Sequence, residues 1–419
     1  MTLDTRVGTV ATVRWTSHEA GDARLEVGAD DHYGRVVEGW SSADGHEHSV
    51  VLAGLAGGEV WHWRAVTRTD AGDEVSDDQL FAPPAPPPEV PSFEASGETD
   101  GYVLVTVVAS TSAVVLLDDE GRAVWWYVPA DGIVVTQARM AANGRDVLLL
   151  EADANLVADL GTIVRVPLAG GEVVRTRAER AHHDFVELDD GRLAYLQVEI
   201  RPFEGEDVAA DGVVELDEAT GATEVVWSAW DTLPTDEIDP ALRFYEDDVD
   251  WTHANALVHD ADDDRYWVSL HNLDALVLVD PGSGEIVHRF GEGPSDVALT
   301  AGEPFHGQHG PALVPEGFVV FDNGDPTTGS LASRAVEYAV DEAAGTWREV
   351  WSFAGDRALW SPFLGNVERL GDESTLVNWG GAGRLSRVGP DGSVGWQADV
   401  ELGAALGFAH VVPDVGGAP

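Results

Sequence analysis

Two histidine-bearing segments have residue types and spacing suited to a reaction centre. In HHDFVELDDGRLAYL, His183 lies eight residues before Gly191, and in QHGPALVPEGFVVF, His309 lies eight residues before Gly317. Equal offsets from an equivalent turn place the two side chains at equivalent positions in copies of one structural unit. If those copies surround an axis, the imidazoles converge on it. They can then bind an anion, transfer protons, attack as nucleophiles or hold a metal.

Other polar side chains accompany these histidines. His253 and Asn255 lie two residues apart, which predicts that they share one face of a strand and donate hydrogen bonds to one oxyanion. Asp322-Asn323-Gly324 is a strong turn signal. Arg334 follows on the next strand, where it either pairs with Asp322 or reaches the centre as an anion clamp. A three-histidine zinc site also fits this inventory, although HExxH is absent.

A repeated strand–turn–strand unit predicts the fold that positions these residues. Its turn glycines recur at intervals of roughly 50 to 60 residues, longer than the ~40–45 of a plain four-stranded propeller repeat. Six copies of a four-stranded unit predict an all-β, six-bladed β-propeller with loop insertions. The copies span residues 114–127, 163–176, 213–227, 276–290, 336–351 and 385–396.

The segments between these hairpins supply the other half of each repeat. The innermost strand of each blade lines the central channel of a propeller, so equivalent positions in these segments are expected to form a ring at one mouth of that channel. The position eight residues before the turn is occupied by Thr136, His183, His309, Asn366 and Phe408. The copy that contains His253 carries one or two extra residues in its turn.

The chain divides at a proline-rich stretch. Residues 1–82 alternate apolar and polar side chains between short turns, which predicts a small antiparallel β-sandwich that resembles a fibronectin type III module. FAPPAPPPEVPSF carries six prolines and predicts a stiff linker, with bounds of 83–94. The propeller is predicted over residues 95–419.

Composition limits the possible partners. The formal net charge of −51 disfavours nucleic acid and acidic membrane surfaces. All 24 basic residues are arginine, and the acidic excess is interpreted as an adaptation to concentrated salt. Cysteine is absent, so no disulfide or thiolate site is possible. No apolar run is long enough to span a membrane, and no secretory leader is visible at the start.

At these residues the chain resembles the arylsulfate sulfotransferase (arylsulfotransferase) family. The resemblance covers roughly residues 95–415. It rests on HDF (183–185), WTHAN (251–255), SLHN (269–272), FHGQH (305–309), FDNG (321–324) and SRAVEY (333–338). The family is a six-bladed propeller that moves a sulfuryl group from a phenolic sulfate ester to a phenol without a nucleotide sulfate donor or other cofactor. The bacterial members carry a small β-domain in front and tend to be exported.

The resemblance implies roles for individual residues. His309 corresponds to the nucleophile that forms a sulfohistidine in a ping-pong reaction. His253 and Asn255 correspond to the pair that holds the sulfuryl oxygens, and His183 (or His182) to an acid/base or oxygen donor. The remaining substrate-binding candidates are His271, His306 and Arg334. Related sequences have arginine where this chain has His271, so a permanent bidentate charge is replaced by a single donor that depends on pH.

Two other function classes stay open. A non-catalytic propeller would bind an anionic or aromatic ligand through the same residues. A metal-dependent hydrolase or lyase would use the histidines as ligands. The expected partners are a small aryl sulfate donor and a phenolic acceptor, whereas the oligomeric state and the compartment are left undetermined.

Overall fold

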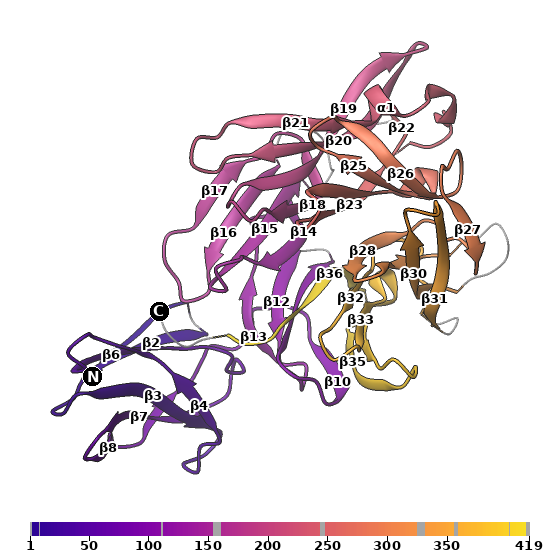
Figure 1. The fold of residues 1–419 in the computed structure, drawn as a ribbon. Helices are drawn as coiled ribbons and strands as arrows, with labels where there is room; N and C mark the ends of the chain where they lie inside the picture. Colours follow the sequence, from indigo (N-terminus) through magenta and orange to yellow (C-terminus); the bar gives the residue numbers. More distant parts are fainter. Residues whose placement is uncertain are drawn as a thin grey trace.

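The computed structural model describes residues 2–415 apart from residues 8, 110–111, 154–160, 244–247, 325–331, 356–358 and 402. Six sheets surround one axis, and two further sheets form a separate body at the N-terminal end (Figure 1). The prediction of an all-β, six-bladed propeller with a β-domain in front is therefore confirmed.

Each blade is built on four antiparallel strands, one of them at the axis, and β27 adds to the outer edge of one blade in parallel. From the axis outward, the first blade contains β36 (Ala405–Val412), β11 (Tyr102–Val108), β12 (Ala113–Leu117) and β13 (Ala123–Tyr127). The second blade contains β14 (Ile133–Met140), β15 (Asp146–Asp153), β16 (Thr162–Pro167) and β17 (Val174–Arg177). The third blade contains β18 (Ala181–Glu187), β19 (Leu193–Phe203), β20 (Glu206–Leu216) and β21 (Thr223–Ser228). The fourth blade contains β23 (Ala254–Asp260), β24 (Arg265–Leu270), β25 (Ala275–Asp280) and β26 (Glu285–Gly291). The fifth blade contains β28 (His309–Val314), β29 (Gly317–Asp322), β30 (Arg334–Asp341), β31 (Thr346–Ala354) and β27 (Ala298–Ala301). The sixth blade contains β32 (Asn366–Arg369), β33 (Thr375–Asn378), β34 (Arg384–Val388), β35 (Val394–Val400) and β10 (Phe93–Gly97). The six predicted hairpins coincide with β12–β13 and its counterparts in the other blades.

Short elements complete the propeller. They are α1 (Ala229–Thr232), η1 (Thr235–Glu237), β22 (Val249–Asp250), η2 (His271–Leu273) and η5 (Gly380–Ala382). The hairpin β19–β20 is longer than its counterparts, and β22 pairs with β20 in parallel.

The innermost strands form a closed ring. Going round the axis, β36, β14, β18, β23, β28 and β32 each contact the next, and β32 contacts β36. Thr136, His183, His309, Asn366 and Phe408 all lie in these innermost strands, one to a strand. The predicted ring of equivalent positions is therefore present.

The two ends of the propeller sequence join the blades at two places, one at the axis and one at an outer edge. β36 is the last strand of the described residues and occupies the axial position of the first blade, where it pairs with β11. β10 is the first propeller strand and forms the outer edge of the last blade, where it pairs with β35. Because β10 begins at Phe93, this strand starts within the segment predicted as linker. An outer edge strand tolerates the preceding Pro91, since only one of its sides must form a ladder.

The N-terminal body is a sandwich of two sheets. One has the order β1 (Thr2–Val7), β2 (Val10–Thr16), β6 (Glu47–Leu52) and β5 (Trp40–Ser41). The other has the order β4 (Arg35–Glu38), β3 (Gly21–Gly28), β7 (Trp61–Thr69) and β8 (Gly72–Val75), with β9 (Gln79–Phe81) also paired to β7. Trp63 is buried between them, and Trp15 and Trp61 pack against the same core. The likeness to a fibronectin type III module stays a prediction.

The sandwich and the propeller share apolar contacts. Val10, Val51 and Ala53 of the sandwich belong to one buried cluster with Leu104 and Val412 of the first blade. The two bodies therefore meet through buried aliphatic surface as well as through the proline-rich segment.

A buried carboxylate links three innermost strands. Asp184 of β18 accepts hydrogen bonds from Arg139 (2.7 Å) and Gln137 (2.9 Å) of β14 and from one backbone amide each of β18 and β23. We expect Asp184→Ala to lower the free energy of unfolding by about 3–5 kcal/mol, because it leaves the arginine and several buried donors without their acceptor. Urea unfolding measures this loss. Asp189→Ala, at an exposed turn of the same hairpin, is the control, and equal midpoints for the two variants would contradict this role.

Candidate active site

Five histidines form a continuous row beside the axis. His182 and His183 lie near the start of β18, His253 directly precedes β23, His271 begins η2, and His309 begins β28. Consecutive ring centroids along this row are 5.0, 4.9, 5.3 and 5.3 Å apart. The structure thus brings together the histidines that the sequence analysis selected from separate blades.

Hydrogen bonds set the orientation and tautomer of His309. Asn323 donates its side-chain amide to the carbonyls of Ser361 (2.8 Å) and Leu364 (2.9 Å), which leaves its Oδ1 as the acceptor. His309 Nδ1 lies 2.9 Å from this oxygen and 3.1 Å from the Gly307 carbonyl, so Nδ1 carries the proton. The lone pair is then on Nε2, where the Leu364 amide donates a hydrogen bond (3.3 Å).

The environment keeps His309 uncharged. Burial, with a smaller contribution from His271, lowers the pKa of His309 to about 3, although the hydrogen bond to Asn323 acts in the opposite direction. An imidazole that is neutral, oriented and unprotonated at Nε2 meets the electronic requirement for a nitrogen nucleophile. Asn323 belongs to the Asp-Asn-Gly sequence that the sequence analysis identified and directly follows β29, and the turn predicted there extends into residues outside the described part of the chain.

His253 has the opposite electrostatic character. Its Nδ1 lies 2.6 Å from Asp250 Oδ2. Burial disfavours the imidazolium, but the hydrogen bond and the charge of Asp250 outweigh burial and raise the pKa of His253 above its usual value. Asp250 is itself buried and is held on β22. His253 is therefore the member of the row that carries positive charge most readily.

The neighbours of His253 are kept neutral. Burial and the charge of His253 lower the pKa of His183 and of His271. His271 Nδ1 also lies 3.0 Å from Asn272 Oδ1, and Asn272 donates to the Asp250 carbonyl (2.8 Å). The environment therefore favours the charged form of His253 and the neutral forms of His183 and His271. At position 271, where the resemblance implies arginine, the pKa of the histidine is lowered and its neutral form is favoured.

A second carboxylate supports the other end of the row. Asp211 Oδ1 lies 3.0 Å from His182 Nε2, and His182 Nδ1 lies 2.8 Å from His183 Nδ1. Thr252 and the Ala254 amide donate to the other oxygen of Asp211 at 2.6 and 2.5 Å. Sequence reasoning missed Asp211 because it lies on β20, far along the chain from both histidines. Asp250 could have been found, since it stands three residues before His253.

Asn255 is placed by the segment that contains His309. Its side-chain amide donates to the Gln308 carbonyl (2.7 Å), while Gln308 donates to Ser269 (3.1 Å) and to the carbonyls of Leu270 and Ala275. These bonds attach the Gln-His segment to the neighbouring blade. One hydrogen of the Asn255 amide is used in this way, and its predicted contact with a sulfuryl oxygen stays a prediction.

The reason given for pairing His253 with Asn255 was wrong. His253 lies outside β23 in a left-handed backbone conformation (φ 46°), and the ladder shifts register between Ala254 and Ala256. The alternation of strand faces therefore does not apply across this tripeptide. His183 (φ 53°) and Leu364 (φ 60°) are left-handed as well, so three non-glycine residues at this site adopt a costly conformation.

Arg334 has the first of its two expected roles. Its Nε donates to Asp322 (2.7 Å), and its terminal nitrogens donate to Glu349 (3.0 Å) and to the carbonyls of Glu303 and Pro304. These acceptors occupy the guanidinium, so the assignment of Arg334 as a substrate clamp is corrected to a brace. It holds the loop that leads to His309.

His306 belongs to the same brace. Its amide donates to Asp322 (3.0 Å), and its Nδ1 lies 3.6 Å from Asp274 Oδ2. Within the described part of the chain, Asp274, Glu292 and His306 also form one of two groups of possible metal ligands, and the histidine row is in neither group. The row extends from ring to ring and does not converge on one point.

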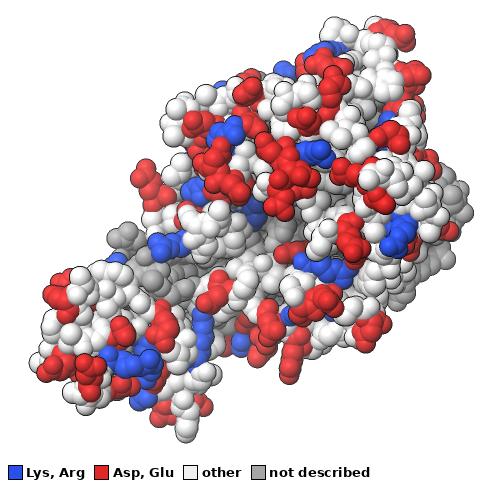
Figure 2. All heavy atoms as spheres, viewed as in Figure 1, with Lys and Arg blue, Asp and Glu red and all other residues white. Residues whose placement is uncertain are grey.

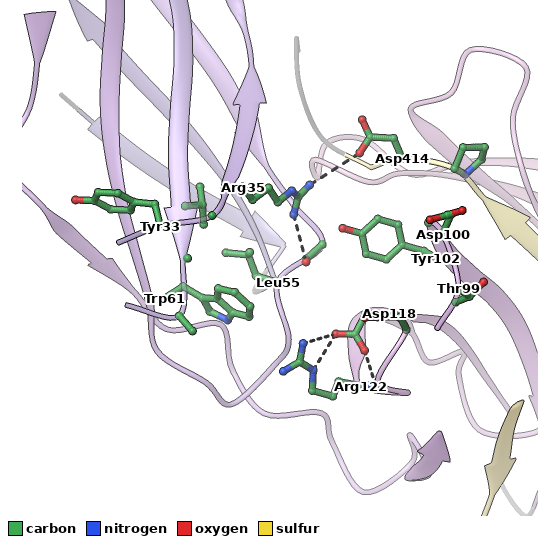
Figure 3. A pocket seen from close by; sticks show the side chains of 18 residues that line it. Tyr33, Arg35, Leu55, Trp61, Thr99, Asp100, Tyr102, Asp118, Arg122 and Asp414 are labelled. Carbon is green, nitrogen blue, oxygen red and sulfur yellow. Dashed lines mark hydrogen bonds and ion pairs between the residues drawn. The ribbon is translucent and has the colours of Figure 1, made fainter. Parts of the chain in front are cut away.

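A cavity of about 560 Å³ lies away from this row, between the sandwich and the first blade (Figure 3). Its two arginines already have partners. Arg35 donates to the carbonyls of Ala53 (2.8 Å) and Val415 (3.0 Å), and Arg122 donates to Asp118 (2.8 Å). None of the predicted site residues lines this cavity.

The surroundings are strongly acidic. Figure 2 shows Asp and Glu side chains spread over the visible face of both bodies, with few Arg side chains among them. A charge of this sign repels free anions, so the cationic tendency of His253 is a local exception. The adaptation to concentrated salt stays a prediction. Among the described residues, no helix has the length and apolar character to cross a membrane.

Comparison with known proteins matches this chain to a family. Residues 90–398 match the family model described as arylsulfotransferase (ASST). Arylsulfate sulfotransferase AssT from Escherichia coli O6:H1 (strain CFT073) is 35% identical over 79 residues, which span 17% of this chain and only 13% of that protein.

Among solved structures, a catalytically inactive virginiamycin B lyase from Staphylococcus aureus with quinupristin is 11% identical, with a TM-score of 0.41 over 72% of this chain and 87% of that one. A streptogramin B lyase is 10% identical, with a TM-score of 0.42 over 74% and 98%. The family match includes strands of all six blades and every histidine of the row, and it ends before β36. This chain therefore belongs to the arylsulfotransferase family.

Proposed function

We propose that this protein transfers a sulfuryl group from a phenolic sulfate ester to a phenolic acceptor through a covalent intermediate on His309, without a nucleotide sulfate donor. The observation that carries the proposal is the state of His309. It is neutral, its Nδ1 proton is fixed by Asn323 and Gly307, and its Nε2 lone pair faces the Leu364 amide. Family membership supports the reaction class.

In the first half of the reaction, the lone pair of His309 Nε2 forms a bond to sulfur. The bond between sulfur and the aryl oxygen breaks, and its electron pair leaves on the phenolate. The Leu364 amide, which donates to Nε2 in the free protein, is then next to the transferred group and donates to one of its oxygens. In the second half, the acceptor phenol attacks sulfur and the electron pair returns to Nε2.

His253 supplies the positive charge that the sulfate ester needs. The resemblance implies arginine at the position of His271, but here the pKa of His271 is lowered by burial and by His253. The Asp250–His253 pair compensates, because the raised pKa of His253 favours an imidazolium in the middle of the row. We assign the sulfuryl-oxygen contacts to His253 and to the second amide hydrogen of Asn255.

Turnover of p-nitrophenyl sulfate tests the function directly. We expect nitrophenolate release that accelerates when a phenol is added, because the acceptor regenerates free His309. The assay is run at high salt to screen the net charge of the protein. Release that is unchanged by phenol contradicts group transfer. Tight binding of an aryl sulfate without release would indicate the ligand-binding alternative, and release that a chelator stops would indicate the metal-dependent one.

A further inference from the structure

The Asp211–His182–His183 chain has no place in the half-reactions above, yet it is a buried polar arrangement directly beside His253. Asp211 and His182 are both buried, with 1% and 4% of their surface exposed. Two consecutive polar contacts, of 3.0 and 2.8 Å, run from the carboxylate through His182 to His183. His183 then meets the ring of His253 edge-on at 4.9 Å.

The acceptor half-reaction creates a problem that this chain can solve. The phenolic proton must go to a base when the oxygen attacks sulfur. His183 is the neutral ring next to His253, but a second imidazolium beside His253 is disfavoured by charge repulsion. A base at this position works best if the positive charge that it gains on protonation is moved away from His253.

We propose that Asp211 and His182 form a proton relay that lets His183 accept the phenolic proton while remaining neutral. Because the carboxylate is an acceptor, His182 Nε2 carries a proton, and its Nδ1 accepts the Nδ1 proton of His183. His183 Nε2 is then the basic nitrogen. When it takes the proton from the phenol, the Nδ1 proton of His183 passes across 2.8 Å to His182 Nδ1.

The charge therefore comes to rest on His182, against the Asp211 carboxylate. Protons balance over the cycle: the stored proton returns through His183 to the phenolate that leaves in the next donor step. Thr252 and the Ala254 amide hold the second oxygen of Asp211, so the carboxylate stays aimed at His182. Asp211 and His182 are positioning residues in this scheme, since neither touches the substrate.

This inference rests on the proposed function, and the acceptor series tests it. We expect Asp211→Asn to slow transfer to unsubstituted phenol by about 100-fold, but to slow transfer to strongly acidic phenols much less, because those react as phenolates and need no base. The first burst of nitrophenolate from p-nitrophenyl sulfate should be unchanged, since that step needs no base. Asp263→Asn, at an exposed turn, is the control. An equal loss with every phenol, or loss of the burst, would show a purely structural role.

A second measurement requires neither a variant nor turnover. In nitrogen-15 spectra of histidine-labelled wild-type protein, His182 should carry a proton on Nε2, and His183 should be neutral. His182 with a bare Nε2, or a cationic His183, would overturn the relay. If wild-type protein releases no nitrophenolate, the proposed function fails while these spectra still decide the arrangement of protons. The two failures are therefore distinguishable.

Discussion

Replacing His309 with alanine abolishes sulfuryl transfer, with an expected loss of at least about 10⁴-fold in turnover of p-nitrophenyl sulfate. The variant lacks the only atom to which we assign the covalent bond with sulfur, Nε2. Mass spectrometry of wild-type protein mixed with the donor alone should show one added sulfuryl group, and the variant should show none. The loss should be similar with every donor and every acceptor, because both half-reactions pass through the same nitrogen.

The fold of this variant should persist, because the substitution removes only the hydrogen bonds to Asn323, Gly307 and Leu364 and the ring contact with His271. Circular dichroism and the urea midpoint check that expectation. His259→Ala is the matched control, since His259 is a histidine of β23 whose partner is the exposed Asp264. Full activity in the His309 variant, or an added sulfuryl group on it, would end the assignment of the nucleophile.

Removing the charge partner of His253 is expected to have the next largest effect. Asp250→Asn should lower kcat/KM by about 10²–10³-fold at neutral pH, because burial then acts on His253 without its hydrogen-bonded carboxylate, and the weaker effect of Asp211 does not keep the imidazolium. In the wild type, the raised pKa of His253 keeps its imidazolium populated at pH values above those at which an ordinary histidine loses its proton. Activity is therefore present below that pKa and falls as the pH rises through it.

The variant should move this alkaline limb to lower pH, so part of the lost activity returns when the pH is lowered. A pH profile of kcat/KM for both proteins measures the shift. Asp264→Asn, which breaks the exposed Asp264–His259 pair of the same blade, should leave the profile in place. An unshifted limb in Asp250→Asn would show that His253 does not supply the charge.

The sequence predicted the architecture because its signals were local and repeated. A hairpin with a turn glycine recurs in every blade, so strand positions and the inner ring could be inferred by counting from one turn. The same counting brought His183 and His309 to the axis. His253 was selected from the same repeat, although its copy departs from the strict spacing and the residue is left-handed. The resemblance added His271, which begins a short helix.

The supporting residues were harder to predict because their partners are distant in sequence. Asp211 reaches His182 from two strands away, and Asn323 reaches His309 from the far side of a hairpin. Arg334 was ambiguous because an arginine near an expected anion site has the same pattern whether it binds substrate or a carboxylate. Only its distance of 2.7 Å from Asp322 decides between the two. Local patterns thus predict which side chains reach the axis, whereas tertiary contacts determine their protonation.

The double closure of the propeller has a consequence for biosynthesis. His182 and His183 emerge from the ribosome long before His309, and the ring cannot close until β36, the last strand, is made and pairs with β11. Pairing strands that are so far apart in the chain is slow, because the chain loses conformational entropy on closing the long loop before it gains the stabilising contacts. A nascent or truncated chain that lacks β36 should therefore hold its imidazoles apart, and the proposed reactivity toward sulfate esters should begin only once β36 has been made and has paired with β11.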